Sequence, residues 1–264
     1  MFYRIKFLAY KLAIGSAIRR AKKIIAVSDF TRKDILGRYG VKKDKIALTY
    51  ESCDDFCNIP AQNEIDTHEK YGLADARRGI IKRYLLYVGN SYPHKNLEKL
   101  ILAFSDIRKN NEDLFLVLVG KHDFFYNRLI RLAEEEKIKN IIFPGYIPDQ
   151  DLDVIYKKTE LYVFPSLYEG FGIPPLEAMA KGVPVAASDH ECLREVLEDS
   201  AYFFDARSSD KIASAVRVLL DDADMRQSLI GKGYEQIKKY SWRKMAEETL
   251  DIYKSAVETK TNIG

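Results

Sequence analysis

The sequence predicts an α/β protein built on a doubly wound parallel sheet, with a second, partial lobe in front of it. The first observation is an alternation, from residue 83 onward, of short β-branched or aromatic runs with amphipathic stretches, which is typical of strand, crossover helix and next parallel strand. The second is that each short run is apolar on both faces, as a buried strand should be. The third is a composition of 47% hydrophobic and 31% charged residues, which is usual for a folded globular chain.

The elements of the main domain follow from this alternation. Strands are predicted over residues 84–88, 115–119, 141–143, 161–164, 183–186 and 202–204. Helices between them are predicted over 97–110, 125–137, 149–157 and 176–181, several of them ending at Gly or Asn. The chain then becomes helical throughout, with helices over 208–221, 224–239 and 242–258.

A shorter pattern precedes residue 60. It consists of a helix, a strand over 24–27, a helix over 31–39 capped by Ser28, and a strand over 46–49, which is too little to close a sheet. We therefore expect four parts: the incomplete end of a first lobe over 1–60, a linker with one short helix over 61–80, the main domain over 81–241, and a C-terminal helix over 242–264 that packs back towards the first lobe.

Charge and cysteine content exclude several classes. The formal net charge is +3, and basic residues are spread along the chain except near residues 19–23, so a nucleic-acid-binding stripe is not indicated. The cysteines, Cys53, Cys57 and Cys192, are odd in number and lack the paired spacing of a structural zinc site. A reducing compartment such as the cytosol fits them better than a disulfide framework.

The segment 2–23 is apolar and basic, but lysines interrupt it, so neither a membrane span nor a signal peptide is predicted. Its apolar residues Phe2, Ile5, Leu8, Ala9 and Leu12 recur at helical spacing. Such a helix either packs on protein or rests on a membrane surface. We expect packing, because core helices are far commoner.

Ligands of an open parallel sheet bind outside the carboxyl ends of its strands, so the loops at those ends are where chemistry is expected. The loop PSLYEGFGIPPLEAMAKGVPV follows the strand over 161–164. Gly170 and Gly172 allow the backbone to approach a ligand closely, and Pro174 and Pro175 set the geometry of a helix start without needing amide protons.

The start of that helix is expected to point its positive end, with the unpaired amides of Phe171, Gly172 and Ile173, at a phosphate or sugar hydroxyl. Two carboxylates flank the loop. Glu169 precedes the prolines and Glu177 lies in the first helical turn, so both can accept hydrogen bonds from vicinal hydroxyls in one pocket. Singly, Glu169 is equally a solvated side chain and Glu177 a favourable charge at a helix N-terminus. The Gly-x-Gly-x-Pro-Pro frame between them favours function.

A second loop, YVGNSYPHKNLEKLI, ends a strand at Gly89, continues through Asn90 and places Lys95 just ahead of a helix. A lysine there can meet a diphosphate as a point charge, although a solvated surface lysine is the default for such a residue in isolation.

A third loop, PGYIP, follows the strand over 141–143. Gly145 allows close approach, and main-chain groups of Tyr146 and Ile147 could hydrogen-bond a flat base. A tight turn explains this loop equally well.

Together these segments resemble the C-terminal part of a family-four glycosyltransferase with the GT-B fold, whose C-terminal domain is Rossmann-like and binds a nucleotide sugar. The segments that carry the resemblance are KIIAVSDFTRKDIL, YLLYVGNSYPHKNLEKLI, LFLVLVG, the run from IIFPGYIPDQ through SLYEGFGIPPLEAMAKGVPVAAS, and the closing SWRKMAEETLDIY, which span nearly all of residues 20–255. The Glu-x7-Glu block is the most specific of them.

The resemblance implies a role for each matching residue. Glu177 would hold the ribose hydroxyls, Glu169 would contact hydroxyls of the donor sugar, and Lys95 would neutralise the diphosphate leaving group, so Glu169 and Lys95 are the candidate catalytic residues. The other candidates would bind substrate: the amides of Phe171, Gly172 and Ile173 the sugar and phosphate, Gly145, Tyr146 and Ile147 the base, with Gly89 and Asn90 beside Lys95.

Neither a metal nor a cofactor is implied beyond the nucleoside diphosphate sugar itself. The alternating Asp149, Asp151 and Asp153 open a helix and are interpreted as capping and surface charge rather than metal ligands. In the family the anomeric configuration is retained by front-face attack as the diphosphate departs, so stabilising the leaving group is the main electrostatic task.

The sequence departs from the family at several positions. Asn90 stands where many relatives have Arg, so a second phosphate-binding cation is not expected at this position. The Gly-rich loop and His that line the acceptor side do not occur either, and we expect the chain to lack most of that domain. Its own histidines are elsewhere: His68, expected at the surface of the linker, His94, expected to face solvent, and His122 and His190 in the main domain.

Two hypotheses follow. The first is a retaining transferase that moves a mannose- or glucose-like hexose from a nucleoside diphosphate sugar to a saccharide or lipid-linked acceptor in envelope polysaccharide synthesis. It would act in the cytoplasm or at the inner face of the membrane, with a partner chain supplying the acceptor domain. The second is a truncated, non-catalytic module that binds nucleotide sugars. A dinucleotide-dependent oxidoreductase is disfavoured, because Gly-x-Gly-x-x-Gly never follows a predicted strand.

Overall fold

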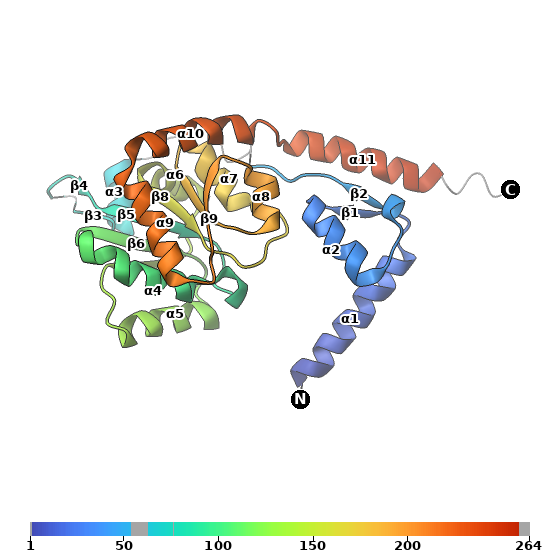
Figure 1. The fold of residues 1–264 in the computed structure, drawn as a ribbon, viewed down its shortest axis with the longest axis horizontal. Helices are drawn as coiled ribbons and strands as arrows, with labels where there is room; N and C mark the ends of the chain where they lie inside the picture. The colour runs from blue at the N-terminus through green and yellow to red at the C-terminus, as the bar shows by residue number, and fades with distance from the viewer. Residues whose placement is uncertain (1, 54–62, 76, 259–264) are drawn as a thin grey trace.

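A six-stranded parallel sheet forms the centre of the protein in the computed structural model, which describes residues 2–53, 63–75 and 77–258, with side chains from residue 5 onward (Figure 1). The strands are β5 (Arg83–Val88), β6 (Leu114–Val119), β7 (Ile141–Gly145), β8 (Leu161–Phe164), β9 (Val185–Ser188) and β10 (Ala201–Phe204). Every pairing between them is parallel. The predicted α/β fold with a doubly wound parallel sheet is confirmed.

The strand order is β10-β9-β8-β5-β6-β7. The chain therefore starts in the middle of the sheet, moves outward through β6 to β7, and returns to the other side of β5 to lay down β8, β9 and β10. The strand order reverses between β5 and β8, where Leu85 pairs with Leu161 and Leu86 with Tyr162. In open α/β sheets this switch point is where ligand crevices form, outside the carboxyl ends of the strands.

Helices flank the sheet and close its core. Their bounds are α4 (Leu97–Ile107), α5 (Phe124–Glu135), α6 (Asp149–Lys158), α7 (Ile173–Ala180), α8 (Glu191–Leu197), α9 (Ser209–Asp221) and α10 (Ala223–Ile237). Helix α4 packs against α5 and α9, and α7 packs against α10. Central strand residues such as Leu85, Val117 and Val163 are wholly buried. Burial of each such side chain favours folding by about 1.5–3 kcal/mol.

Several element bounds differ from the prediction, and two of the differences lie close to the glycine-rich loop. Strand β9 begins at Val185, because Pro184 has no N–H and the Val183 amide donates to Ala178 at the end of α7. Helix α7 begins at Ile173, so the prolines lie inside its first turn. Helix α8 was not predicted at all.

The first lobe is small. It contains α1 (Phe2–Arg20), β1 (Ile24–Ala26), α2 (Asp29–Tyr39), the 3-10 turn η1 (Lys43–Lys45) and β2 (Ile46–Leu48), and β1 pairs with β2 in parallel. Ser28 caps α2 as predicted, since its Oγ accepts the Thr31 amide proton. Gly40, at φ 59°, ends the helix in the left-handed conformation that favours glycine.

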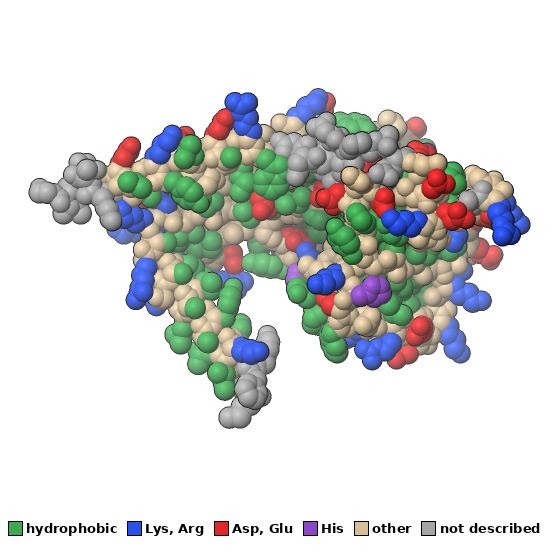
Figure 2. Space-filling model, turned by 180° about the vertical axis from the view of Figure 1, so that it is seen from behind, with side chains coloured by type: hydrophobic (Ala, Val, Ile, Leu, Met, Phe, Trp, Pro, Cys, Tyr) green, Lys and Arg blue, Asp and Glu red, His purple; other side chains and the backbone are tan. Residues whose placement is uncertain are grey.

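The prediction that the first helix packs on the protein is wrong for its described side chains. Helix α1 projects away from the main domain, and Ile5, Leu8 and Leu12 are each about 60% exposed (Figures 1 and 2). All side chains from residue 5 to residue 13 are exposed. The side chain of Phe2 lies outside the described residues. None of the helices in the described ranges combines the length and the apolar character of a membrane span.

The region predicted as a linker contains more structure than expected. Helix α3 (Glu64–Lys70) is the short helix of the prediction, but β3 (Ala74–Asp75) and β4 (Ile80–Ile81) form an antiparallel hairpin after it. His68 is wholly buried rather than at the surface, because its Nδ1 bonds the Glu64 carbonyl and its Nε2 lies 3.0 Å from the Tyr84 hydroxyl. Cys57 and residues 61–62 lie outside the described residues.

The last helix, α11 (Trp242–Glu258), runs from the main domain over the first lobe (Figure 1). Near its end, the Lys22 ammonium donates a 2.8 Å hydrogen bond to the Ala256 carbonyl. Residues 259–264 lie outside the described residues. Helix α11 therefore bridges the two lobes.

Candidate functional site

The loops that follow β5 and β8 form one surface at the switch point of the sheet. The His94 carbonyl in the first loop accepts hydrogen bonds from the Leu167 amide, at 2.7 Å, and from the Ser166 hydroxyl in the second. Asn96 adds a bond from its side-chain amide to the Pro165 carbonyl at 3.2 Å. Two loops far apart in sequence are thereby held at one place.

Lys95 and Glu169 meet on this surface. Lys95 ends the 3-10 turn η3 (Pro93–Lys95), and its Nζ lies 2.6 Å from Oε1 of Glu169. The two side chains are only 14% and 11% exposed, and the ammonium lies over the Phe164 ring, 5.5 Å from its centroid. A cation and a carboxylate held together can exchange their mutual bond for a phosphate oxygen and a hydroxyl.

Glu177 lies on the same side of the sheet, in the second turn of α7 rather than the first, because α7 begins earlier than predicted. The Tyr156 hydroxyl donates to Oε2 of Glu177 at 3.1 Å. Burial raises the pKa of Tyr156 well above its ordinary value, so this hydroxyl remains a donor at neutral pH. Burial, then Tyr87, Glu177 and more weakly Glu169 raise the pKa of Tyr162.

The glycine-rich loop between the carboxylates has the geometry that only glycine tolerates. Gly172 has φ 105° and forms the N-cap of α7, and a Cβ there would lie 2.8 Å from Cδ2 of Leu193. The ring of Phe171 packs against Tyr50 and Tyr240. Only main-chain groups of Phe171 therefore remain for contact with a ligand. Ile173 is partly buried in the first turn of α7.

The third predicted loop lies further along the same edge, two strands from β5. Gly145, at φ 78°, donates its amide proton to the Tyr126 hydroxyl at 2.9 Å. Ile147 is buried, whereas Tyr146 is 70% exposed. The ring of His122 lies next to Gly145, and its position just after β6 is the signal that could have placed it in the site.

Gly89 and Asn90 lie at the end of β5, beside Lys95. The Tyr87 hydroxyl donates to the Asn90 carbonyl at 2.8 Å, and Asn90 Oδ1 accepts the Tyr92 amide proton. The Asn90 side chain therefore shapes its own loop.

One further correction concerns a charged group. Asp153 is not surface charge: it is 1% exposed and pairs with Lys157 and with Lys181, itself 3% exposed. Across the described part of the chain, His, Cys, Asp and Glu side chains do not gather into a group of three that could hold a metal ion. Sequence reasoning also missed Thr31 and Glu195, which join the first lobe to the glycine-rich loop and to α8.

A doubly wound domain with a glycine-rich loop at its switch point is the architecture of the GT-B glycosyltransferases, and solved structures of that class superpose on this chain. Sucrose-phosphate synthase from Thermosynechococcus elongatus matches 94% of the chain and 61% of its own, with a TM-score of 0.77 and 23% identity. The Anabaena protein HepE in complex with UDP and glucose matches 93% of the chain and 65% of its own, with a TM-score of 0.75 and 17% identity.

The family described as "Glycosyl transferases group 1" matches residues 78–236, and the chain belongs to this family. The O-antigen chain mannosyltransferase B of Escherichia coli is 31% identical over 245 residues, which cover 92% of this chain. The match covers 63% of that relative, so the chain spans somewhat less than two thirds of its length.

Proposed function

We propose that the chain transfers a hexose, mannose- or glucose-like, from a nucleoside diphosphate sugar to a saccharide or lipid-linked acceptor in envelope polysaccharide synthesis. The observation that carries the proposal is the pairing of Lys95 with Glu169 at the switch point, next to the Glu177–Tyr156 pair. Membership of the family supports transfer chemistry, and the mannosyltransferase relative makes mannose the first sugar to test.

In this proposal, binding of the donor breaks the ion pair between Lys95 and Glu169. The ammonium turns to the diphosphate, whose charge grows as the bond to the sugar breaks, and the carboxylate accepts hydroxyl protons of the sugar. Glu177 holds the ribose, and its Tyr156 bond keeps it oriented. The acceptor attacks from the face the diphosphate leaves, so configuration is retained, and neither an enzyme nucleophile nor a metal takes part.

Donor binding is the direct test. We expect one of UDP-glucose, GDP-mannose and ADP-glucose to raise the melting temperature of the chain in a concentration-dependent manner. Lys95→Ala should bind that donor but slow its turnover or hydrolysis, with about 1.4 kcal/mol of lost transition-state stabilisation for each factor of ten. Lys109→Ala is the matched control, because Lys109 is also paired with a carboxylate, Asp106, but at the far end of α4. Full rate in Lys95→Ala at saturating donor would contradict the assignment.

The alternative is a non-catalytic module that binds nucleotide sugars and needs a partner chain for the acceptor side. It is favoured by the exposed apolar side chains on α1 and α11, visible in Figure 2, which are surfaces that protein commonly covers. Donor binding without transfer or hydrolysis, even with candidate partner chains added, would favour this alternative over the enzyme.

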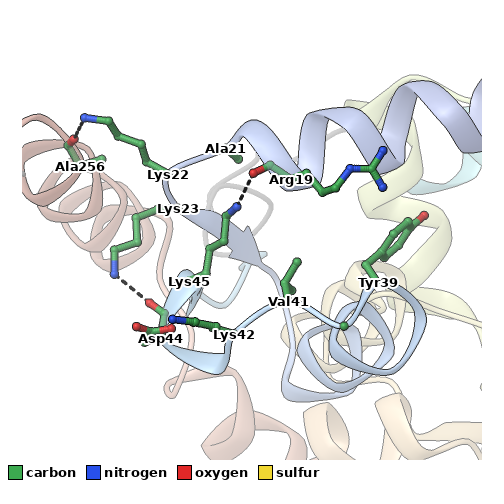
Figure 3. Close-up of a pocket in the computed structure, with 11 residues that line it drawn as sticks. Arg19, Ala21, Lys22, Lys23, Tyr39, Val41, Lys42, Asp44, Lys45 and Ala256 are labelled. Atoms are coloured by element: carbon green, nitrogen blue, oxygen red, sulfur yellow. Dashed lines mark hydrogen bonds between the residues drawn. The ribbon is translucent and has the colours of Figure 1, made fainter.

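We also propose that the chain works in the cytoplasm, in peripheral contact with an anionic membrane. A cavity of about 720 Å³ lies where α1, η1 and α11 meet, and Arg19, Lys22, Lys23, Lys42 and Lys45 line it (Figure 3). Three of these lysines donate to main-chain carbonyls, and within the described residues none of the five cations pairs with a carboxylate. Residues 2–23 add exposed apolar side chains and contain no Asp or Glu.

Vesicle flotation tests this contact. Each Lys or Arg near an anionic surface contributes about 1 kcal/mol of attraction, so the native chain should float with phosphatidylglycerol vesicles and not with phosphatidylcholine vesicles. Lys22→Glu with Lys23→Glu should abolish flotation. Lys238→Glu with Lys239→Glu, which reverses two neighbouring exposed lysines on the other lobe, should leave it intact. Equal binding to both vesicle types, or to neither, would contradict the contact.

A further inference from the structure

The first lobe holds one carbonyl of the glycine-rich loop. The hydroxyls of Ser28, which is wholly buried, and of Thr31 lie 2.6 Å and 3.1 Å from the carbonyl oxygen of Gly170 and donate to it. Both side chains come from the start of α2. Gly170 stands between Glu169, which pairs with Lys95, and Phe171. A peptide group next to the candidate site is thus fixed by side chains of the other lobe.

The start of α2 is itself fixed by α8. One oxygen of Glu195 accepts the Asp29 amide proton at 2.6 Å and the Tyr50 hydroxyl proton at 3.0 Å, and the other accepts the Phe30 amide proton at 2.8 Å. A carboxylate at the first turn of a helix satisfies amides that have no partner within the helix and matches the positive end of its dipole. Ser28 and Thr31 are therefore anchored rather than free to follow the loop.

Fixing the Gly170 carbonyl also fixes the amide proton of Phe171. The two belong to the same planar, trans peptide group, in which C=O and N–H point in opposite directions. Because the oxygen points to α2, the Phe171 N–H points away from it, to the loop's other side. Within the described chain this N–H has no hydrogen-bond acceptor, although Phe171 is only 2% exposed. Buried amides without an acceptor are rare in native proteins, and a bound ligand can supply one.

We propose that Ser28 and Thr31, anchored through Glu195, are positioning residues that aim the Phe171 amide at the diphosphate or sugar of the donor. This inference rests on the proposed function and extends it across the lobe junction. The specific consequence is selectivity: these hydroxyls matter for the part of the donor beyond the nucleoside monophosphate, which is the β-phosphate and the sugar, and not for the base and ribose held near Glu177. A junction that merely held the lobes together would show no such selectivity.

Thr31→Val is the sharpest variant, because it removes a hydroxyl while keeping the β-branched shape, and Ser28 remains to cap the helix. Ser28→Ala is the second variant, with a melting curve to separate the loss of the cap from the loss of binding. Thr31→Ser, which retains the hydroxyl, is the conservative rescue. Lys33→Ala is the matched control, since Lys33 joins α2 to Glu191 of α8 through an exposed ion pair of 2.8 Å.

Calorimetry of the full chain with UDP-glucose, GDP-mannose and ADP-glucose, and with UMP, GMP and AMP, gives the readout. For the donor that the native chain binds, Thr31→Val should weaken the affinity for the nucleotide sugar about fivefold, the equivalent of one hydrogen bond of about 1 kcal/mol. The affinity for the corresponding monophosphate should not change. If Thr31→Val weakened the affinity for both ligands equally, or changed neither affinity, this inference would be overturned and the proposed function would still stand. Absence of binding by the native chain to any nucleotide sugar would overturn both.

Discussion

Glu195 offers a quantitative test of how the two lobes are joined. Its carboxylate accepts three hydrogen bonds from the first lobe, two from main-chain amides and one from Tyr50. Burial, with the Glu195 carboxylate adding to it, raises the pKa of Tyr50 to about 12, so the hydroxyl stays protonated and continues to donate. Glu195→Ala leaves three donors without their acceptor. A hydrogen bond to a charged group contributes about 1.5–3 kcal/mol, and water can reach this half-buried site.

We therefore expect Glu195→Ala to lower the free energy of unfolding by about 2–4 kcal/mol and Glu195→Gln, which keeps one acceptor oxygen, by about 1–2 kcal/mol. Glu191→Ala on the same helix removes an exposed ion pair and should cost below about 1 kcal/mol. Urea unfolding followed by the fluorescence of Trp242, the sole tryptophan, and by circular dichroism measures all three. If Glu195→Ala were no more destabilising than Glu191→Ala, the carboxylate would not join the lobes as described.

Two further predictions concern folding. Gly172→Ala should lower the free energy of unfolding by about 1–3 kcal/mol, because φ is 105° and the new Cβ meets Leu193. Gly231→Ala, in the open interior of α10, should raise it by about 0.5–1 kcal/mol, and equal melting temperatures for the two variants would contradict the strain at Gly172. Burial lowers the pKa of His68 below its ordinary 6.5, so the unfolded chain binds the proton more readily. Its contribution to stability should be full above pH 6.5 and lost as the pH falls towards the folded pKa. Urea midpoints should therefore fall less steeply across that window in His68→Gln than in the native protein.

The sheet and its site loops could be predicted because their signals are local. Runs of buried apolar residues mark the strands, and the loops follow them directly. Helix α8 had a signal of the same kind, since Leu193, Val196 and Leu197 recur at helical spacing, but the segment is short and sits between two strands. The prediction of packing for α1 failed because periodicity indicates a helix but not what covers it.

Contacts across long sequence separations could not be predicted. Lys95 and Glu169 were assigned separate partners, yet they bind each other, because β5 and β8 are neighbours only after the chain reverses its order in the sheet. The same holds for Glu195 and the start of α2, and for His68, whose burial depends on Tyr84 in the sheet. In each case the sequence gives the residue type but does not indicate which residue it contacts.

The chain passes between the lobes twice, once after β2 near Tyr50 and once between α10 and α11 near Tyr240. The rings of these two tyrosines are 5.7 Å apart, and the Phe171 ring packs against both. Two tethers that meet at one point behave as a pivot, which permits rotation and resists separation. Any rotation of one lobe against the other about this cluster would displace the distant ends most and Phe171 least.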